Sequence, residues 1–169
     1  VLSWIIFLGL CIEAGGIIFN SIFTHFINPV AANNFWEGID FSALYSFDYG
    51  YFFVIVLLMS IVAILKALMF YQIVNALNYK KLNLSEPFSI GLRKVIVNIA
   101  YIVLAIGLFS IFGIGYSQWL AEKNISMPKV EKMGFDGAGV WLFMSIILFV
   151  IAQIFKRGIE LQEENDLTI

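Results

Sequence analysis

The sequence predicts an all-α integral membrane protein, a four-helix transmembrane bundle with its N-terminus and C-terminus in the cytoplasm. Three observations predict this class: an apolar composition, four long apolar segments, and cations gathered in particular connections. Hydrophobic residues make up 61% of the 169 residues and charged residues only 13%, against about 45–50% and about 25% in soluble domains. The length suits a single transmembrane domain, 1–169.

The four apolar segments are long enough to cross a bilayer, which takes about 20 mostly apolar residues in a helix. Asn28-Pro29 ends the first segment, and Pro87 suits the start of the third. The chain is already apolar at Val1, so we expect further residues before it. The predicted spans are about 1–27, 51–79, 88–118 and 137–162.

The orientation follows from the short connections, because Lys and Arg collect on the cytoplasmic side of a membrane. The connection 28–50 has no Lys or Arg, whereas 80–87 begins with two lysines. We therefore expect 80–87 and the acidic tail 160–169 in the cytoplasm, and 28–50 on the outer side. The other outer connection, 119–136, carries charges of both signs. The expected cytoplasmic basic patch consists of Lys80, Lys81, Arg93, Lys94, Lys156 and Arg157.

The first connection is too apolar for a free loop. It contains Phe35, Trp36, Phe41 and Phe47 within a short stretch. We expect it to pack on the helices, or to lie in the membrane interface as an amphipathic segment. A lid over a bound ligand is the alternative.

Each predicted span contributes one strongly polar residue to a band in the inner half of the membrane: Glu13, Lys66, Asn98 and Gln153. A rise of about 1.5 Å per residue places the four roughly 21–27 Å below the outer face. A charge at the bilayer centre costs about 2.5–3.5 kcal/mol, so we expect Glu13 and Lys66 to pair. Gln153 and Asn98 would complete their hydrogen bonds. Two alternatives stay open, namely snorkelling of Lys66 to the cytoplasmic surface and a proton or ion pathway.

The sequence lacks motifs for catalysis, for cofactors and for metal binding. It has no phosphate-binding Gly-rich loop, no His-Glu-x-x-His, no Gly-x-Ser-x-Gly and no CxxC. One cysteine, Cys11, and one histidine, His25, allow neither an internal disulfide nor a Cys/His metal site. The absence of a long basic stripe argues against direct nucleic-acid binding. We expect no enzymatic activity, no cofactor and no metal.

The C-terminal run carries a resemblance to a known family. It reads Phe155-Lys156-Arg157-Gly158, then Leu161-Gln162-Glu163-Glu164-Asn165-Asp166-Leu167-Thr168-Ile169, with support from Pro87-Phe88 and Arg93-Lys94. This run resembles the ending of the bacterial four-span membrane proteins grouped as domain-of-unknown-function 2975. The resemblance implies a multi-pass protein of the bacterial cytoplasmic (inner) membrane, without established activity or binding residues. Members are often encoded beside a small helix-turn-helix regulator.

These observations lead us to expect a non-enzymatic sensor or tether that acts with a cytoplasmic regulatory partner. Lipid headgroups would contact the basic patch, and a basic surface on the regulator would contact the tail. The alternative is a small transporter or channel subunit that uses Glu13 and Lys66, completed by another membrane subunit. A tail that is simply a solvated helix end also stays open, as does the oligomeric state. The tail residues expected to bind a partner are Glu160, Glu163, Glu164, Asp166, Leu167 and Ile169.

Overall fold

The computed structural model describes residues 2–78 and 88–166, and every regular element in that part is helical. Four helices are long and apolar enough to cross a membrane, which confirms the predicted all-α class and fits a multi-pass membrane protein. They are α1 (Leu2–Phe26), α3 (Tyr49–Asn78), α4 (Ile90–Glu122) and α5 (Ala138–Asp166). Three short helices lie between α1 and α3: η1 (Pro29–Asn34), η2 (Trp36–Gly38) and α2 (Ser42–Phe47).

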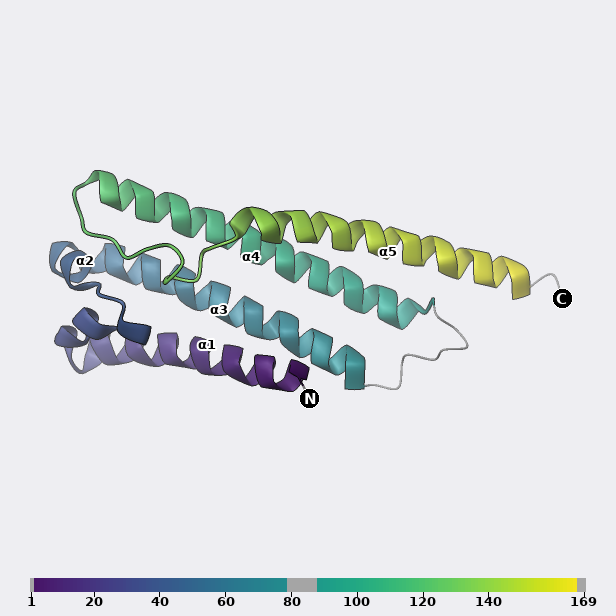
Figure 1. Cartoon of the computed structure of the whole chain (residues 1–169), viewed down its shortest axis with the longest axis horizontal. Coiled ribbons are helices and arrows are strands. Elements are labelled where there is room, and N and C mark those ends of the chain that lie inside the picture. Colours follow the sequence, from purple (N-terminus) through teal and green to yellow (C-terminus); the bar gives the residue numbers. More distant parts are fainter. Residues whose placement is uncertain (1, 79–87, 167–169) are drawn as a thin grey trace.

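The long helices lie side by side in an open row, in the order α1, α3, α4, α5 (Figure 1). Within the described residues each long helix contacts only its neighbours in that row, so α1 does not reach α4 or α5. The row is therefore not closed into a ring, and α1 and α5 are its two edges. We call the end of the row that holds the connections 27–48 and 123–137 the loop end. The opposite end holds the start of α1 and the end of α5.

Glycine and serine on α4 allow α5 to pack closely against it. A Cβ built on Gly107 would lie 2.6 Å from the Leu142 side chain and 3.1 Å from its backbone nitrogen. Ser110 and Gly113 follow on the same face and are buried, at spacings that place them along one helix face. These small residues of α4 thus serve packing within the chain.

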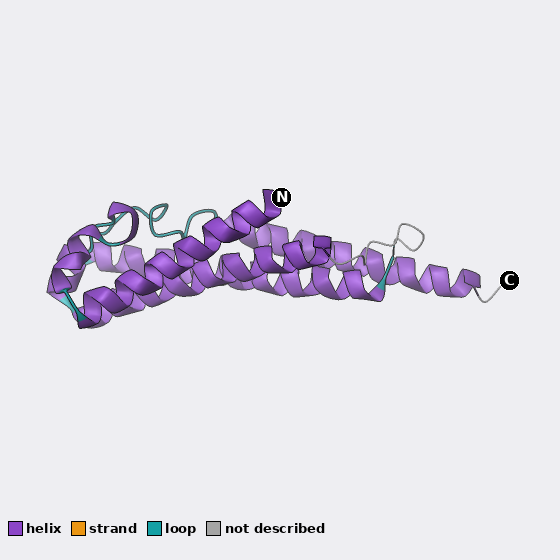
Figure 2. Cartoon of the chain, turned by 90° about the horizontal axis from the view of Figure 1, so that it is seen from below, coloured by secondary structure: helices purple, strands orange, loops and turns teal. Residues whose placement is uncertain are grey.

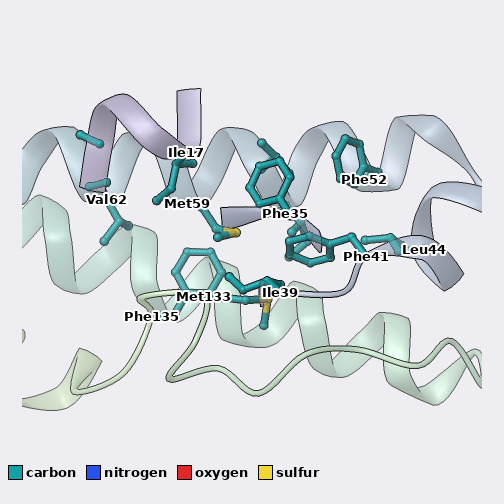
Figure 3. Packing of buried hydrophobic residues seen from close by; sticks show 14 of the residues in the cluster. Ile17, Phe35, Ile39, Phe41, Leu44, Phe52, Met59, Val62, Met133 and Phe135 are labelled. Atoms are coloured by element: carbon teal, nitrogen blue, oxygen red, sulfur yellow. The ribbon is translucent and has the colours of Figure 1, made fainter. Parts of the chain in front are cut away.

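The aromatic first connection packs on the helices, as its composition predicts. Phe35, Ile39, Phe41 and Leu44 are all buried in the main hydrophobic core (Figure 3). The rings of Phe35 and Phe41 both contact Phe52 of α3 edge-on, with centroids about 6 Å apart, a favourable aromatic geometry. The connection is a fixed cap on α1 and α3.

Residues 123–137 fold back from the loop end along α3 and α4 before α5 begins (Figure 1). Asn124, with φ 61°, ends α4 in a left-handed conformation. The Asn124 nitrogen donates to Ala121 and the Ile125 nitrogen to Leu120, which together form a Schellman motif. The chain therefore reverses at Asn124, and Figure 2 shows it lying with the first connection over one side of the helices.

This returning segment enters the core. Met133 and Phe135 are fully buried, and Figure 3 shows them beside Met59 of α3. The Phe135 ring also packs against Gly113 of α4, where a Cβ would lie 2.6 Å from it. The predicted outer connection 119–136 is therefore not a free loop, because α4 continues to Glu122 and the remainder is inserted along the helices.

Candidate functional site

Lys66 of α3 links that helix to the inserted segment. Its Nζ donates a 2.9 Å hydrogen bond to the carbonyl oxygen of Gly134. Helical side chains lean toward the N-terminus of their helix, so Lys66 leans toward the loop end, where the segment lies. The Lys66 Cα is roughly 22 Å along α3 from Tyr51. The half-buried ammonium thus has a backbone partner at a depth where lipid could offer none.

Gly134 presents this carbonyl because the chain turns sharply there. Its φ is +76°, a conformation that glycine adopts without steric cost. The Gly134 nitrogen donates to the Glu131 carbonyl and the Phe135 nitrogen to the Val130 carbonyl. These two bonds form a second Schellman motif. The turn aims the Gly134 carbonyl at α3 and sends Phe135 into the core.

Glu13 of α1 lies beside the same glycine. A Cβ built on Gly134 would lie 3.7 Å from the Lys66 Nζ and 3.8 Å from the Glu13 Oε1. The carboxylate and the ammonium therefore flank one point, but they do not form an ion pair within 4.0 Å. The expected Glu13–Lys66 ion pair is wrong, because the Gly134 carbonyl takes up the ammonium instead. The predicted proximity of the two side chains is correct.

Asn98 and Gln153 do not join this group. Both side chains are exposed, and neither makes a hydrogen bond within the described residues. Asn98 lies on the same exposed face of α4 as Tyr101, whose ring contacts Phe149 of α5. Gln153 sits on α5, which packs only against α4. The expectation that they complete the hydrogen bonds of Glu13 and Lys66 is therefore wrong.

The basic patch is only partly described. Lys80 and Lys81 lie outside the described residues. Arg93 is half-buried, and its enclosed Nε has no hydrogen-bond partner among the described residues. The remaining members, Lys94, Lys156 and Arg157, are exposed near the opposite end.

The acidic tail extends α5 beyond its packing on α4. Gly158 lies against the Phe88 ring, where a Cβ would be 2.6 Å from it, and α5 continues roughly 12 Å further to Asp166. Glu160 is already engaged by Arg157, with Nη1 and Oε2 3.1 Å apart, and by Lys156 at 3.9 Å. Exposed acidic residues follow one turn later.

Glu163 and Glu164 are these exposed acidic residues. Asp166 is the last residue of the helix, and Leu167 and Ile169 lie outside the described residues. The structure thus places the first part of the expected partner-binding tail on a projecting helix end (Figure 1).

Two further findings bear on the chemistry of the site. In the part of the chain that the structure describes, no three His, Cys, Asp or Glu side chains gather as metal ligands. Gly134 was not among the site residues predicted from the sequence. The signal that could have identified a turn there is the pair of glycines, Gly134 and Gly137, around an apolar Phe135 in an otherwise charged connection.

Comparison with known proteins gives a match to a protein family. A family model described as "Protein of unknown function (DUF2975)" matches residues 21–169. The matched region begins after Glu13 and includes Lys66 and Gly134. No curated protein and no solved structure matches the chain. Because the family model covers most of the sequence, the chain belongs to the DUF2975 family of proteins of unknown function.

Proposed function

We propose that this protein is a non-enzymatic sensor of the bacterial inner membrane that passes a change at its loop end through α5 to a cytoplasmic partner. The Lys66–Gly134 hydrogen bond is the observation that carries the proposal. It fixes the inserted segment to α3, and that segment runs directly into α5. The cation distribution supports an outer loop end and a cytoplasmic opposite end.

The connection between the hydrogen bond and α5 is short. Three residues separate Gly134 from Ala138, the first residue of α5. The Phe135 ring is held against Gly113, and Gly137 turns the chain with φ +69°. A displacement of Gly134 is therefore passed to the start of α5 rather than absorbed by a long linker. Packed elements of this kind switch between discrete positions rather than deform continuously.

The opposite end of α5 offers the partner surface. Its projecting turns expose Leu161, Glu163 and Glu164, beyond the cations that engage Glu160. An acidic helix end suits a partner with a basic surface. A helix-turn-helix regulator, of the kind implied by the family resemblance, has such a surface. The protein would hold or release it according to the position of α5.

The open row gives the transporter or channel alternative less support. The long helices contact only their neighbours within the described residues, so they do not enclose a lumen. The Lys66 ammonium is also engaged by a backbone carbonyl rather than by a carboxylate. A conducting path would need further copies or another subunit.

Spin-label distances between α4 and α5 test the coupling. Nitroxides are placed at Ile90→Cys and Glu163→Cys in a Cys11→Ser background, and the protein is reconstituted in phosphatidylethanolamine/phosphatidylglycerol liposomes. Both labelled positions are exposed. Lys66→Met should shift or broaden the distance distribution, whereas the exposed Asn98→Leu should leave it unchanged. An identical distribution in the Lys66→Met protein would overturn the proposal.

Co-purification from the native membrane tests the partner. A truncation that removes 163–169 keeps Glu160 with its two cations. Recovery of the helix-turn-helix regulator encoded beside this protein should fall sharply with this truncation, while Asn98→Leu should not affect it. Undiminished recovery would exclude the projecting end of α5 as the contact.

A further inference from the structure

The two connections at the loop end meet in a hollow of about 320 Å³. One wall comes from residues within 38–43 and the other from residues within 126–132. The volume lies in the range of small-molecule sites, about 300–1,000 Å³. The hollow is separate from the Lys66–Gly134 contact, but its second wall belongs to the same inserted segment.

Two lysines line this hollow, Lys129 and Lys132. Both are exposed, and within the described residues neither has a carboxylate within 4.0 Å or a side-chain hydrogen bond. Lys123, further back on the segment, differs because its Nζ lies 4.1 Å from the centre of the Trp119 ring. The two lysines of the hollow are thus the cations of this segment that are available to a ligand.

The facing wall supplies an anion. Asp40 lines the hollow, and its Oδ1 accepts a 2.8 Å hydrogen bond from the Ser42 nitrogen. Hydrogen bonds from the Ser42 side chain and backbone lower the pKa of Asp40 below its ordinary value. Its carboxylate is therefore ionised at neutral pH, opposite two ammonium groups.

We propose that this hollow binds the phosphoethanolamine headgroup of a membrane lipid, with the phosphate on Lys129 and Lys132 and the ammonium on Asp40. The arrangement suits a phosphate joined to a hydrogen-bonding ammonium. An anionic headgroup without an ammonium would leave Asp40 facing negative charge. A choline headgroup cannot donate a hydrogen bond to the carboxylate.

The position of the hollow favours a lipid over a soluble ligand. The rings of Tyr51, Tyr116 and Trp119 cluster at the same end of the row. Such aromatic groups mark the level of lipid headgroups.

The inference deepens the proposed function. Lipid binding in the hollow does not depend on that function, and only the effect of the lipid on signalling rests on it. A ligand held on Lys129 and Lys132 would stabilise the turn that presents the Gly134 carbonyl. The backbone nitrogens of Lys132 and Met133 both donate to the Lys129 carbonyl, so the two lysines belong to that turn.

Native mass spectrometry of the purified full chain tests the site. The protein is mixed with equal concentrations of phosphatidylethanolamine, phosphatidylglycerol and phosphatidylcholine. We expect preferential retention of phosphatidylethanolamine. The double variant Lys129→Gln/Lys132→Gln should lower that retention roughly tenfold, corresponding to about 1.4 kcal/mol. Asp40→Asn should abolish the preference among the three lipids.

Two matched variants act as controls. Glu131→Gln changes an exposed charge on the same segment outside the hollow, and Glu122→Gln removes an exposed charge at the end of α4, also outside the hollow. Both should bind as the unchanged protein does. Equal retention of the three lipids by the unchanged protein would overturn the proposal, as would retention unaffected by the double lysine variant. Thermal unfolding of each variant establishes that it is folded.

Competition with free phosphoethanolamine distinguishes the two sources of the headgroup. Failure of the free compound to displace the lipid supports the membrane source, whereas displacement at equal concentration overturns it. The spin-label pair on α4 and α5 separates the site from its signalling role. Lipid binding could depend on Lys129, Lys132 and Asp40 while the distance between the labels does not change when the lipid is added. In that case the lipid site is supported and the sensor proposal fails.

Discussion

The Lys66 ammonium donates a 2.9 Å hydrogen bond to the carbonyl oxygen of Gly134, 68 residues further along the chain. Non-helical backbone within a membrane is tolerated only where protein or water satisfies its polar groups. Here a charged side chain satisfies the carbonyl, and the carbonyl in turn stabilises a charge that would be costly among apolar helices. The bond therefore explains both why a polar residue occurs in α3 and how residues 123–137 stay inserted.

Replacing Lys66 by methionine should release the inserted segment. Methionine keeps a similar length but cannot donate to the Gly134 carbonyl. A hydrogen bond to a charged group contributes about 1.5–3 kcal/mol, and we expect the free energy of unfolding in detergent to fall by this amount. Asn98→Leu is the matched control, because Asn98 is an exposed polar residue on the neighbouring helix. Equal destabilisation by the two variants would show that the bond contributes nothing specific.

Exchanging Glu13 and Lys66 should not restore stability. A simple ion pair would tolerate the exchange, but the ammonium here donates to a carbonyl that a carboxylate at position 66 would repel. We expect the double variant Glu13→Lys/Lys66→Glu to be at least as unstable as Lys66→Met in thermal unfolding. Stability close to that of the unchanged protein would mean that the two side chains form an ion pair in the membrane.

A methyl group at Gly113 should displace Phe135. A Cβ there would lie 2.6 Å from the Phe135 ring, whereas nothing lies within 4 Å of a Cβ at Gly115, two residues further along α4. Overpacking of a core costs typically about 1–3 kcal/mol. Gly113→Ala should lower the unfolding temperature and Gly115→Ala should not. Equal unfolding temperatures would place Phe135 away from α4.

Alanine at Gly134 should destabilise the turn that presents the carbonyl. The left-handed conformation of Gly134 costs a residue with a side chain roughly 1–2 kcal/mol. At Gly139, within α5, nothing lies within 4 Å of an added Cβ, so Gly139→Ala should be neutral or stabilising. Unfolding in detergent compares the two. A neutral effect of Gly134→Ala would exclude a left-handed turn at that residue.

The sequence predicts the four helices well, because long apolar runs leave few other structures open in a membrane. The position of a residue along its helix is also predictable, since the rise per residue is fixed, and Glu13 and Lys66 both lie beside Gly134. The direction in which each side chain points is not predictable in this way. Asn98 and Gln153 lie on exposed faces because the helices form an open row, in which α5 packs only on α4.

The inserted segment escaped prediction for a different reason. Its charged residues, such as Lys129 and Lys132, are typical of an exposed loop, and they are exposed. Its insertion depends on Met133 and Phe135 and on the turn at Gly134. Such short signals give no periodic pattern, which is what predicts helices and strands. The contact with Lys66 joins distant parts of the chain, so local sequence carries no trace of it.

Photo-cross-linking from position 135 tests the insertion of this segment most directly. The photoreactive p-benzoylphenylalanine replaces Phe135 in the full chain, which is irradiated in liposomes, digested and analysed by mass spectrometry. The same replacement at the exposed Phe112 of α4 serves as the control and should react with lipid. The structure predicts that position 135 cross-links to the α4 peptide that contains Gly113. Cross-links from position 135 to lipid alone would contradict an inserted segment and the coupling built on it.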